Sequence, residues 1–258
     1  MKIEKIFSLK NQVVIITGGA GMLGQEYANT LSVIGAKVIL LDIKNKPVNK
    51  KIAYFKINIT KKDEVAKTVK KIIKKFKRID VLINNAALNP VPNTKESSQQ
   101  FSCYENYPIK LWEKEISVGL TGMLICSQAV IPIMKKQKKG VIINICSTYG
   151  IVAPDNRIYD KGKYKSIAYA TVKGAVPNFS RSLSSYLRNT GVRVNTLTLG
   201  GVFAGHKKDF VKKYSDRTIL NRMAKKDEYN GAIIFLASDA SSYMTGTNLI
   251  IDGGWTAW

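Results

Sequence analysis

The sequence predicts an α/β fold in which one doubly wound, mainly parallel sheet extends through residues 1–258 as a single domain. Short apolar runs alternate with longer amphipathic segments along the whole chain, which is typical of strand–helix–strand units. The first apolar run leads straight into a glycine-rich turn and a helical pattern. No repeat or linker divides the chain, and its length allows one sizeable core.

The first predicted strand, residues 12–17 (QVVIIT), is apolar throughout and is therefore expected to be buried on both faces. A glycine-rich turn, residues 18–24, follows it and leads into a helical pattern through Tyr27, Leu31 and Ile34. Glycines in this context allow a tight turn and let the helix N-terminus approach a pyrophosphate. The segment therefore predicts a Rossmann-type dinucleotide site.

The second predicted strand, residues 36–42 (AKVILLD), ends in Asp42. A carboxylate at this position would accept hydrogen bonds from the adenosine ribose and repel a 2′-phosphate. NAD is therefore the predicted cofactor. NADP stays possible because Lys44 and Lys46 follow and could partly offset the repulsion.

The remaining elements continue the alternation to the C-terminus. Further strands are predicted at 53–57, 79–83, 141–145, 192–198 and 248–251, and helices at 60–76, 109–134 (interrupted around Gly119 and Gly122), 167–188 and 227–237. Three irregular segments lie between them, at 88–108, 150–166 and 199–226. Because ligands bind beyond the carboxyl ends of such strands, we expect these segments to form the substrate loops.

Composition narrows the functional classes. The hydrophobic content of 45% and charged content of 23% are ordinary for a soluble protein, and we find no signal peptide or membrane helix. Three cysteines without metal-ligand spacing are typical of reduced thiols, so we expect a cytoplasmic protein without a bound metal.

The formal net charge of +23 raises the possibility of a nucleic-acid partner. Only seven of the 41 cationic residues are arginine, and the lysines are spread over the whole chain. We interpret them as solvated surface charge and expect no nucleic-acid partner, although a positive field would attract anionic cofactors and substrates.

Tyr169 and Lys173 stand four residues apart in a predicted helix, which places both side chains on one face. An ammonium beside a phenol stabilises the phenolate, so the pKa of Tyr169 should fall from roughly 10 towards the working pH. Such a tyrosine can exchange a proton with an alcohol or a carbonyl. A second copy of the pattern, Tyr159 and Lys163, lies ten residues earlier.

A set of motifs in a fixed order resembles the short-chain dehydrogenase/reductase family over essentially the whole chain. The matching segments are TGGAGMLG at 17–24, Asp42, NNAA at 84–87, Ser147, YATVKGA at 169–175, RVNTLTLGG at 193–201, FLASDASSYMTG at 235–246 and IDGG at 251–254. The resemblance implies a seven-stranded sheet in the order 3-2-1-4-5-6-7. It also implies a homotetramer, or a homodimer, packed through the helices at 109–134 and 167–188.

The resemblance implies roles for the matched residues. Tyr169 would be the general acid/base, Lys173 would lower its pKa and bind the nicotinamide ribose, and Ser147 would bind the substrate oxygen. The implied cofactor-binding residues are Gly18, Gly21, Met22, Leu23, Asp42, Asn58, Ile59, Asn85, Ala86, Ala87, Tyr169, Lys173, Gly200 and Val202. Tyr159 fits the family's usual distance from Ser147 better, but the sequence after Tyr169 matches the family, so we favour Tyr169 and assign an insertion to 150–166.

The chain departs from the family pattern at four positions: Met22, Asn58, Leu199 and Gly119. Gly119 is the most consequential, because it replaces the asparagine of the catalytic tetrad. We expect slower proton relay, with space beside the glycine for another water or a backbone carbonyl in its place. A catalytically impaired homologue that acts as a cofactor-binding scaffold is the alternative.

The segment 150–166 suggests the substrate class. Arg157 and Lys163, near Tyr149, suit an anionic ligand such as a phosphorylated or nucleotide-activated sugar, although a solvated lysine-rich loop is equally compatible. The polar composition of 199–226 argues against a steroid or fatty-acyl site. The stretches STYGIVAPDNRIYD and DGGWTAW resemble dehydrogenases of flagellin modification and legionaminic-acid-type sugar pathways; a 3-oxoacyl carrier-protein reductase-like enzyme is the other alternative.

Overall fold

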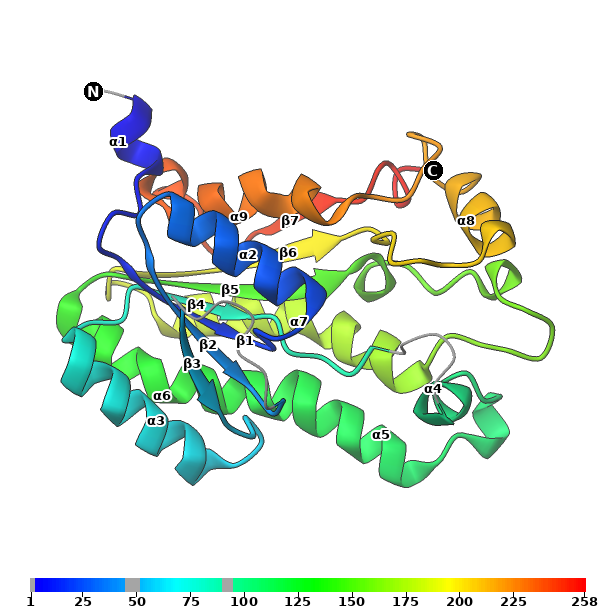
Figure 1. Ribbon diagram of the computed structural model, residues 1–258, viewed down its shortest axis with the longest axis horizontal. Coiled ribbons are helices and arrows are strands. Elements are labelled where there is room, and N and C mark those ends of the chain that lie inside the picture. The colour runs from blue at the N-terminus through cyan, green and yellow to red at the C-terminus, as the bar shows by residue number, and fades with distance from the viewer. Residues whose placement is uncertain (1–2, 45–51, 90–94) are drawn as a thin grey trace.

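A seven-stranded parallel sheet runs through the centre of the molecule (Figure 1). The computed structural model describes residues 3–44, 52–89 and 95–258. The strand order is β3-β2-β1-β4-β5-β6-β7, as the sequence predicts. The strands are β1 Val13–Thr17, β2 Lys37–Asp42, β3 Ala53–Lys56, β4 Val81–Asn84, β5 Gly140–Ser147, β6 Val192–Leu199 and β7 Asn248–Ile251.

Helices cover both faces of the sheet (Figure 1). On one face lie α2 (Met22–Val33) and α9 (Asn230–Ala237), and on the other lie α3 (Lys62–Phe76), α6 (Gly122–Gln137) and α7 (Ile167–Tyr186). Alternate residues of a strand point to opposite faces, so Val14 and Ile16 of β1 pack towards α2 while Val13 and Ile15 pack towards α3 and α6. All five residues of β1 are buried, as the apolar run predicts.

The observed elements lie within a few residues of the predicted ones. Three short helices were not predicted: α1 (Ile3–Phe7), α4 (Lys95–Gln100) and α8 (Lys208–Ser215). The predicted helix at 227–237 begins as a 3₁₀ turn, Lys226–Tyr229, and continues as α9. Of the predicted loop at 88–108, residues 90–94 lie outside the described residues, as does Lys46.

The long helical segment at 109–137 consists of α5 (Ile109–Ile116), a π-helical turn (Ser117–Thr121) and α6. The π turn lies where the sequence predicts an interruption. By length and composition this segment could cross a membrane. Its buried residues include Met123, Cys126, Val130 and Met134, of which the last three pack in the core on the sheet, and we therefore interpret it as a core helix.

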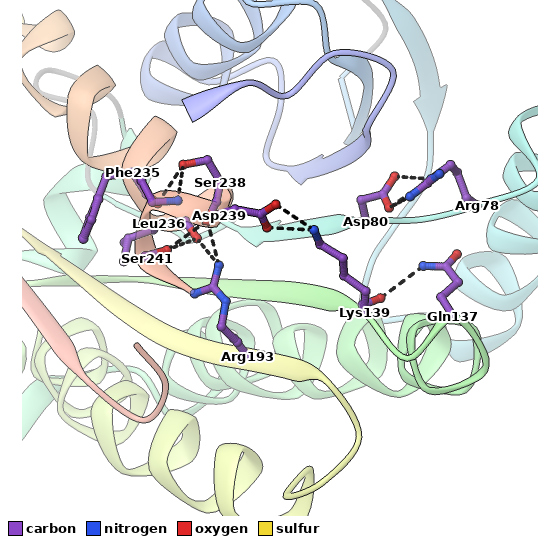
Figure 2. A network of polar contacts seen from close by, with 11 residues as sticks. Arg78, Asp80, Gln137, Lys139, Arg193, Phe235, Leu236, Ser238, Asp239 and Ser241 are labelled. Atoms are coloured by element: carbon purple, nitrogen blue, oxygen red, sulfur yellow. Dashed lines mark hydrogen bonds and ion pairs between the residues drawn. The ribbon is translucent and has the colours of Figure 1, made fainter. Parts of the chain in front are cut away.

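Polar contacts hold together the edge of the sheet at which the strands begin (Figure 2). The Asp80 carboxylate pairs with Arg78 at 2.6 Å and accepts a hydrogen bond from the Val13 amide at 2.8 Å. Lys139 pairs with Asp239 at 2.7 Å. Arg193 of β6 donates to the carbonyl oxygens of Leu236, Ser238 and Met244. These contacts tie α9 and the loop that follows it to the sheet at the edge opposite the functional site.

Candidate active site

The predicted site residues lie at the carboxyl edge of the sheet, where the strands end. Register places Ile16 beside Ile83, so the turn after β1 lies next to the segment after β4. On the other side of β4, Ser147 at the end of β5 pairs with Leu199 of β6. Between β1 and β4 the order of the strands reverses, and the ends of such strands form a crevice for ligands.

The glycine turn is tight and lies directly against the segment after β4. Gly18 has φ +64°, and a Cβ there would lie 2.8 Å from the Ala86 Cα. Asn85 Nδ2 donates to the Thr17 and Gly18 carbonyl oxygens at 3.0 and 3.2 Å, which locks the turn to the segment after β4. The helix α2 begins at Met22 without a side-chain cap, so its first amide groups face the turn.

Asp42 at the end of β2 is tied to the same turn. Its Oδ2 accepts a hydrogen bond from the Ala20 amide at 2.9 Å, and its Oδ1 accepts one from the Lys44 amide at 3.1 Å. A carboxylate has further lone pairs, so Asp42 could also accept from ribose hydroxyls. The turn, the helix terminus and the carboxylate together fit a dinucleotide.

The other residues predicted to bind the cofactor line the strand ends on either side of this turn. The Asn58 Oδ1 accepts from the Thr60 amide and hydroxyl, Ile59 is buried, and Ala87 is half-buried. Gly200 lies against Asp252, because a Cβ there would lie 2.8 Å from the Asp252 Cα. Val202 forms an isolated bridge with Ala224, and Leu23 packs under the turn against the core.

Ser147, Tyr169 and Lys173 converge from two elements. Ser147 ends β5, while Tyr169 and Lys173 lie one turn apart on α7. The N-cap residue Ser166 accepts a hydrogen bond from the Tyr169 amide at 3.0 Å, which sets the start of the helix. The Ser147 side chain lies near enough to Tyr169 to lower the pKa of its phenol. The Lys173 ammonium lies 5.7 Å from the Tyr169 ring centroid and donates to the Ile145 carbonyl oxygen at 2.7 Å.

The sequence-based expectation of a lowered pKa for Tyr169 is wrong for the protein without its cofactor. Burial raises the pKa of Tyr169 to about 12, and the nearby Ser147 side chain only partly offsets it. Burial likewise lowers the pKa of Lys173, because a low-dielectric environment disfavours both charged forms. The phenol of Tyr169 is therefore protonated at neutral pH.

A group of aromatic residues packs beside Tyr169. We call this set the aromatic cluster: Phe101, Tyr149, Tyr159, Phe210, Tyr214 and Trp255. The Tyr214 and Trp255 rings stack at 4.4 Å, and the Tyr149 and Tyr159 hydroxyls are hydrogen-bonded at 3.1 Å. The helix α8 turns Phe210 and Tyr214 inward, one turn apart, and leaves its lysines largely outside. The polar composition of 199–226 thus describes its outer face, and it does not argue for a polar substrate.

A family model described as short chain dehydrogenase matches residues 12–215 of the chain. The chain belongs to the short-chain dehydrogenase family. This confirms the resemblance found in the ordered motifs. The protein is accordingly an oxidoreductase that acts on an alcohol or ketone group with a nicotinamide dinucleotide.

Characterised relatives span nearly the whole chain. A meso-2,3-butanediol dehydrogenase from Serratia marcescens is 31% identical and covers 96% of this chain and 95% of its own length. A 3-oxoacyl-[acyl-carrier-protein] reductase from Thermotoga maritima is 30% identical, over 95% of this chain and 98% of the relative. A post-translational flagellin modification protein A from Campylobacter coli is 26% identical, over 96% and 99%.

Solved structures agree with the fold and differ in cofactor. A short chain dehydrogenase from Leptospira borgpetersenii with bound NAD+ superposes with a TM-score of 0.88 at 31% identity, covering 99% of this chain and 96% of the other. An NADPH-dependent 3-quinuclidinone reductase from Rhodotorula rubra has a TM-score of 0.85 at 28% identity, covering 100% and 96%.

The family resemblance implies an asparagine at position 119, and the structure leaves no space for a side chain there. Gly119 lies in the π turn, and a Cβ there would be 2.5 Å from Cγ1 of the buried Val172. We expected the glycine to leave space for another water. That expectation is wrong in the direction in which a side chain would point, because Val172 fills the space. The expected disturbance of the helix is present as the π turn.

Two of the three predicted substrate residues lie apart from Tyr169. The Arg157 side chain is 78% exposed and pairs with Asp155 at 2.8 Å. The Lys163 side chain is 56% exposed and faces Asp160 at 3.8 Å. Both side chains are exposed to solvent and lie beside a carboxylate, so neither contacts the aromatic cluster. Tyr149 does join it, through Tyr159 and Trp255.

The lysine that does enter the site is Lys165, which the sequence analysis did not single out. Its ammonium lies 4.1 Å from the Tyr169 ring centroid, closer than that of Lys173. The spacing could have identified it, since Lys165, Tyr169 and Lys173 are four residues apart and would lie on one face of a helix. Near it, the buried Glu115 of α5 accepts hydrogen bonds from Gln100, Tyr107 and Ser166.

Among the described residues, no group of three or more histidine, cysteine, aspartate or glutamate side chains could hold a metal ion. Two of the three cysteines, Cys126 and Cys146, are buried, and burial raises the pKa of both thiols. They are therefore protonated, inert core residues.

Proposed function

We propose that this short-chain dehydrogenase interconverts a secondary alcohol and a ketone on a sugar-derived substrate, with NAD as its preferred cofactor. The observation that carries the proposal is the convergence of Ser147, Tyr169 and Lys173 beside the glycine turn. Tyr169 is the proposed acid/base, in preference to Tyr159. Tyr159 lies outside α7, and its hydroxyl is engaged by Tyr149.

The proposed roles follow from the protonation states in the site. The bound dinucleotide supplies the hydride acceptor or donor. Tyr169 holds a proton at its phenol oxygen and can donate it to a ketone oxygen as that oxygen gains charge. Ser147 lies beside the phenol and can hydrogen-bond the same oxygen. Lys173 can stabilise the phenolate left behind, because its ammonium lies on the same helix face.

Asp42 supports the preference for NAD. Its carboxylate is held at the turn by the Ala20 amide, where the adenosine ribose would bind. A 2′-phosphate at that position would face a like charge. Lys44, whose backbone amide contacts Asp42, carries a positive charge that could soften this repulsion.

The proposal of a sugar-derived substrate rests on similarity along the whole chain to the flagellin modification protein A of C. coli. The phosphorylated or nucleotide-activated sugar predicted from Arg157 and Lys163 loses their support, because both side chains face solvent. Support for an anionic substrate now comes from Lys165, whose ammonium lies beside Tyr169.

A reductase of 3-oxoacyl thioesters is a second candidate. The 30% identity to the T. maritima reductase and the aromatic cluster favour it, since aromatic walls also accept an acyl chain. Reduction of an acetoacetyl thioester, followed in parallel with sugar substrates, separates the two. A scaffold without activity, the alternative suggested by Gly119, would bind NAD but turn over neither.

The test is a screen of polyols, sugar acids, sugar phosphates and nucleotide sugars with NAD+ and NADP+, followed by nicotinamide absorbance. We expect turnover with NAD+ on at least one polyhydroxylated substrate and its loss in Tyr169→Phe. Absence of turnover on every secondary alcohol, despite a cofactor-dependent thermal shift, would favour the scaffold.

We also propose that the protein assembles as a homotetramer or homodimer through the segments 109–134 and 167–188. Three large apolar side chains on these helices are exposed: Ile109, Leu124 and Tyr186. Exposed apolar residues on long helices are typical of an interface. Light scattering after size exclusion measures the mass, and a monomer would contradict the proposal.

A further inference from the structure

Lys165 is a buried basic side chain within the candidate active site. Only 8% of the residue is exposed, and its ammonium lies between two rings, 4.1 Å from the Tyr169 centroid and 5.7 Å from the Tyr149 centroid. The only side chain that accepts a hydrogen bond from it in the described part of the chain is Asn89, whose Oδ1 lies 2.9 Å away. Asn89 is neutral and exposed, so it is an exchangeable partner.

Among the described residues, no carboxylate forms an ion pair with Lys165. Glu115 attracts it from a distance, but its carboxylate is already occupied by Gln100, Tyr107 and Ser166. An ammonium has three donors, and a buried charge without a partner is costly. The site therefore has unused capacity for an anion.

The surroundings of Lys165 suit a ligand better than a structural role. Burial lowers the pKa of Lys165 to about 7, and the positive charge of Lys173 adds to this effect. A structural lysine would more simply be solvated or paired, as Lys163 is with Asp160. The His206 ring stacks on Phe210 at 5.0 Å, and burial together with the positive charge of Lys165 lowers the pKa of this imidazole.

We propose that Lys165 is a specificity-determining residue whose ammonium binds an anionic oxygen group of the substrate, a carboxylate or a phosphate. This inference rests on the proposed function, because it places that group next to the hydroxyl that reacts at Tyr169. The ammonium lies over the tyrosine ring, so it and the phenol oxygen are within the span of a small molecule with two polar groups. The anion takes the place that Asn89 holds without substrate.

The competing role for Lys165 is to act on Tyr169 itself. A cation over an aromatic ring also stabilises the phenolate. That role would affect neutral and anionic substrates alike and would shift the pH profile. The specificity role affects anionic substrates alone, so the two are distinguishable.

The test compares matched ligand pairs in the presence of saturating NAD+. Gluconate and sorbitol form the carboxylate pair, and glycerol 3-phosphate and glycerol form the phosphate pair. Thermal shift titration gives each apparent affinity, and initial rates give kcat/KM. We expect wild type to bind the anion of at least one pair about tenfold more tightly than its neutral partner, which is about 1.4 kcal/mol. The pair that shows the preference identifies the anionic group.

Lys165→Met keeps the length and apolar stem of the side chain and removes the charge. It should bring the anion-to-neutral ratio close to one, with a much larger loss of kcat/KM on the anion than on its neutral partner. Lys165→Arg should retain the preference, and the control Lys163→Met, two residues away, should behave as wild type. NAD-dependent stabilisation in each variant shows that it is folded.

Three results would overturn the inference: no anion preference in wild type for either pair, a preference that survives Lys165→Met, or an equal loss of rate on both members of a pair. Failure of the proposed function is separable from these. It would appear as anion binding that depends on Lys165 without turnover of any alcohol or ketone.

Discussion

The backbone of Gly119 packs so closely against Val172 that any side chain at position 119 would have to displace it. A Cβ on Gly119 would lie 2.5 Å from Val172 Cγ1, and Val172 directly precedes Lys173. Glycine in the π turn and valine on α7 are therefore a matched pair. We propose that proton relay in this enzyme uses groups other than the asparagine that the family resemblance implies at position 119.

Gly119→Asn should destabilise the protein by about 1–3 kcal/mol, because overpacking a filled core displaces neighbouring side chains. Gly119→Asn combined with Val172→Ala should recover most of that loss, since the clashing methyl is removed. Urea unfolding followed by circular dichroism measures both. Equal stability of the single variant and wild type would show that Val172 can move aside.

The same double variant tests whether proton relay is slow. If the missing asparagine limits turnover, the double variant should have a higher kcat than wild type at neutral pH, with an altered pH profile. An unchanged rate and profile would show that the relay does not limit this enzyme.

Tyr169→Phe should lower kcat by about 10²–10⁴, the usual contribution of a positioned acid/base, because the phenol proton is lost. NAD-dependent thermal stabilisation should persist. Tyr159→Phe is the matched control, since its hydroxyl contacts Tyr149 and lies outside the helix. If the two variants exchanged these behaviours, the earlier tyrosine–lysine pair would be the catalytic one.

Alcohol oxidation should accelerate with pH across the neutral range. Oxidation needs the phenolate of Tyr169, and the raised pKa of about 12 keeps the phenol protonated at pH 7. Below that pKa the phenolate fraction grows about tenfold per pH unit, so kcat/KM for oxidation should rise with a slope near one from pH 7 to 9. Ketone reduction needs the protonated phenol and should stay flat. A plateau in oxidation by pH 7 would mean that cofactor binding reverses the effect of burial.

Asp42→Asn should shift cofactor preference towards NADP. The amide keeps an acceptor for the Ala20 amide, so the turn is retained, while the charge that repels a 2′-phosphate is removed. We expect the ratio of kcat/KM for NADP+ over NAD+ to increase about tenfold or more, as for loss of one charged hydrogen bond. Asp239→Asn, at the opposite edge of the sheet, serves as a charge-matched control and should leave the ratio unchanged.

The fold and the position of the candidate dinucleotide turn could be predicted because their signals are local. The apolar run before Gly18, the turn itself and the acid at Asp42 are each set by a few adjacent residues. Strand β7 was predicted with its observed bounds for the same reason. Short helices such as α8 were missed, because tertiary packing of Phe210 and Tyr214 supports them more than sequence pattern does.

The sequence by itself thus determined the order of strands and helices, the dinucleotide turn and the candidate residues Ser147, Tyr169 and Lys173. Only the tertiary structure decided which lysine of the segment 150–166 enters the site, since Lys163 and Lys165 differ in burial rather than in type. It also decided the direction of the Tyr169 pKa and the closure of Gly119 by Val172. Burial and contacts depend on residues far apart in the chain, and the spacing of residues in the sequence does not predict them.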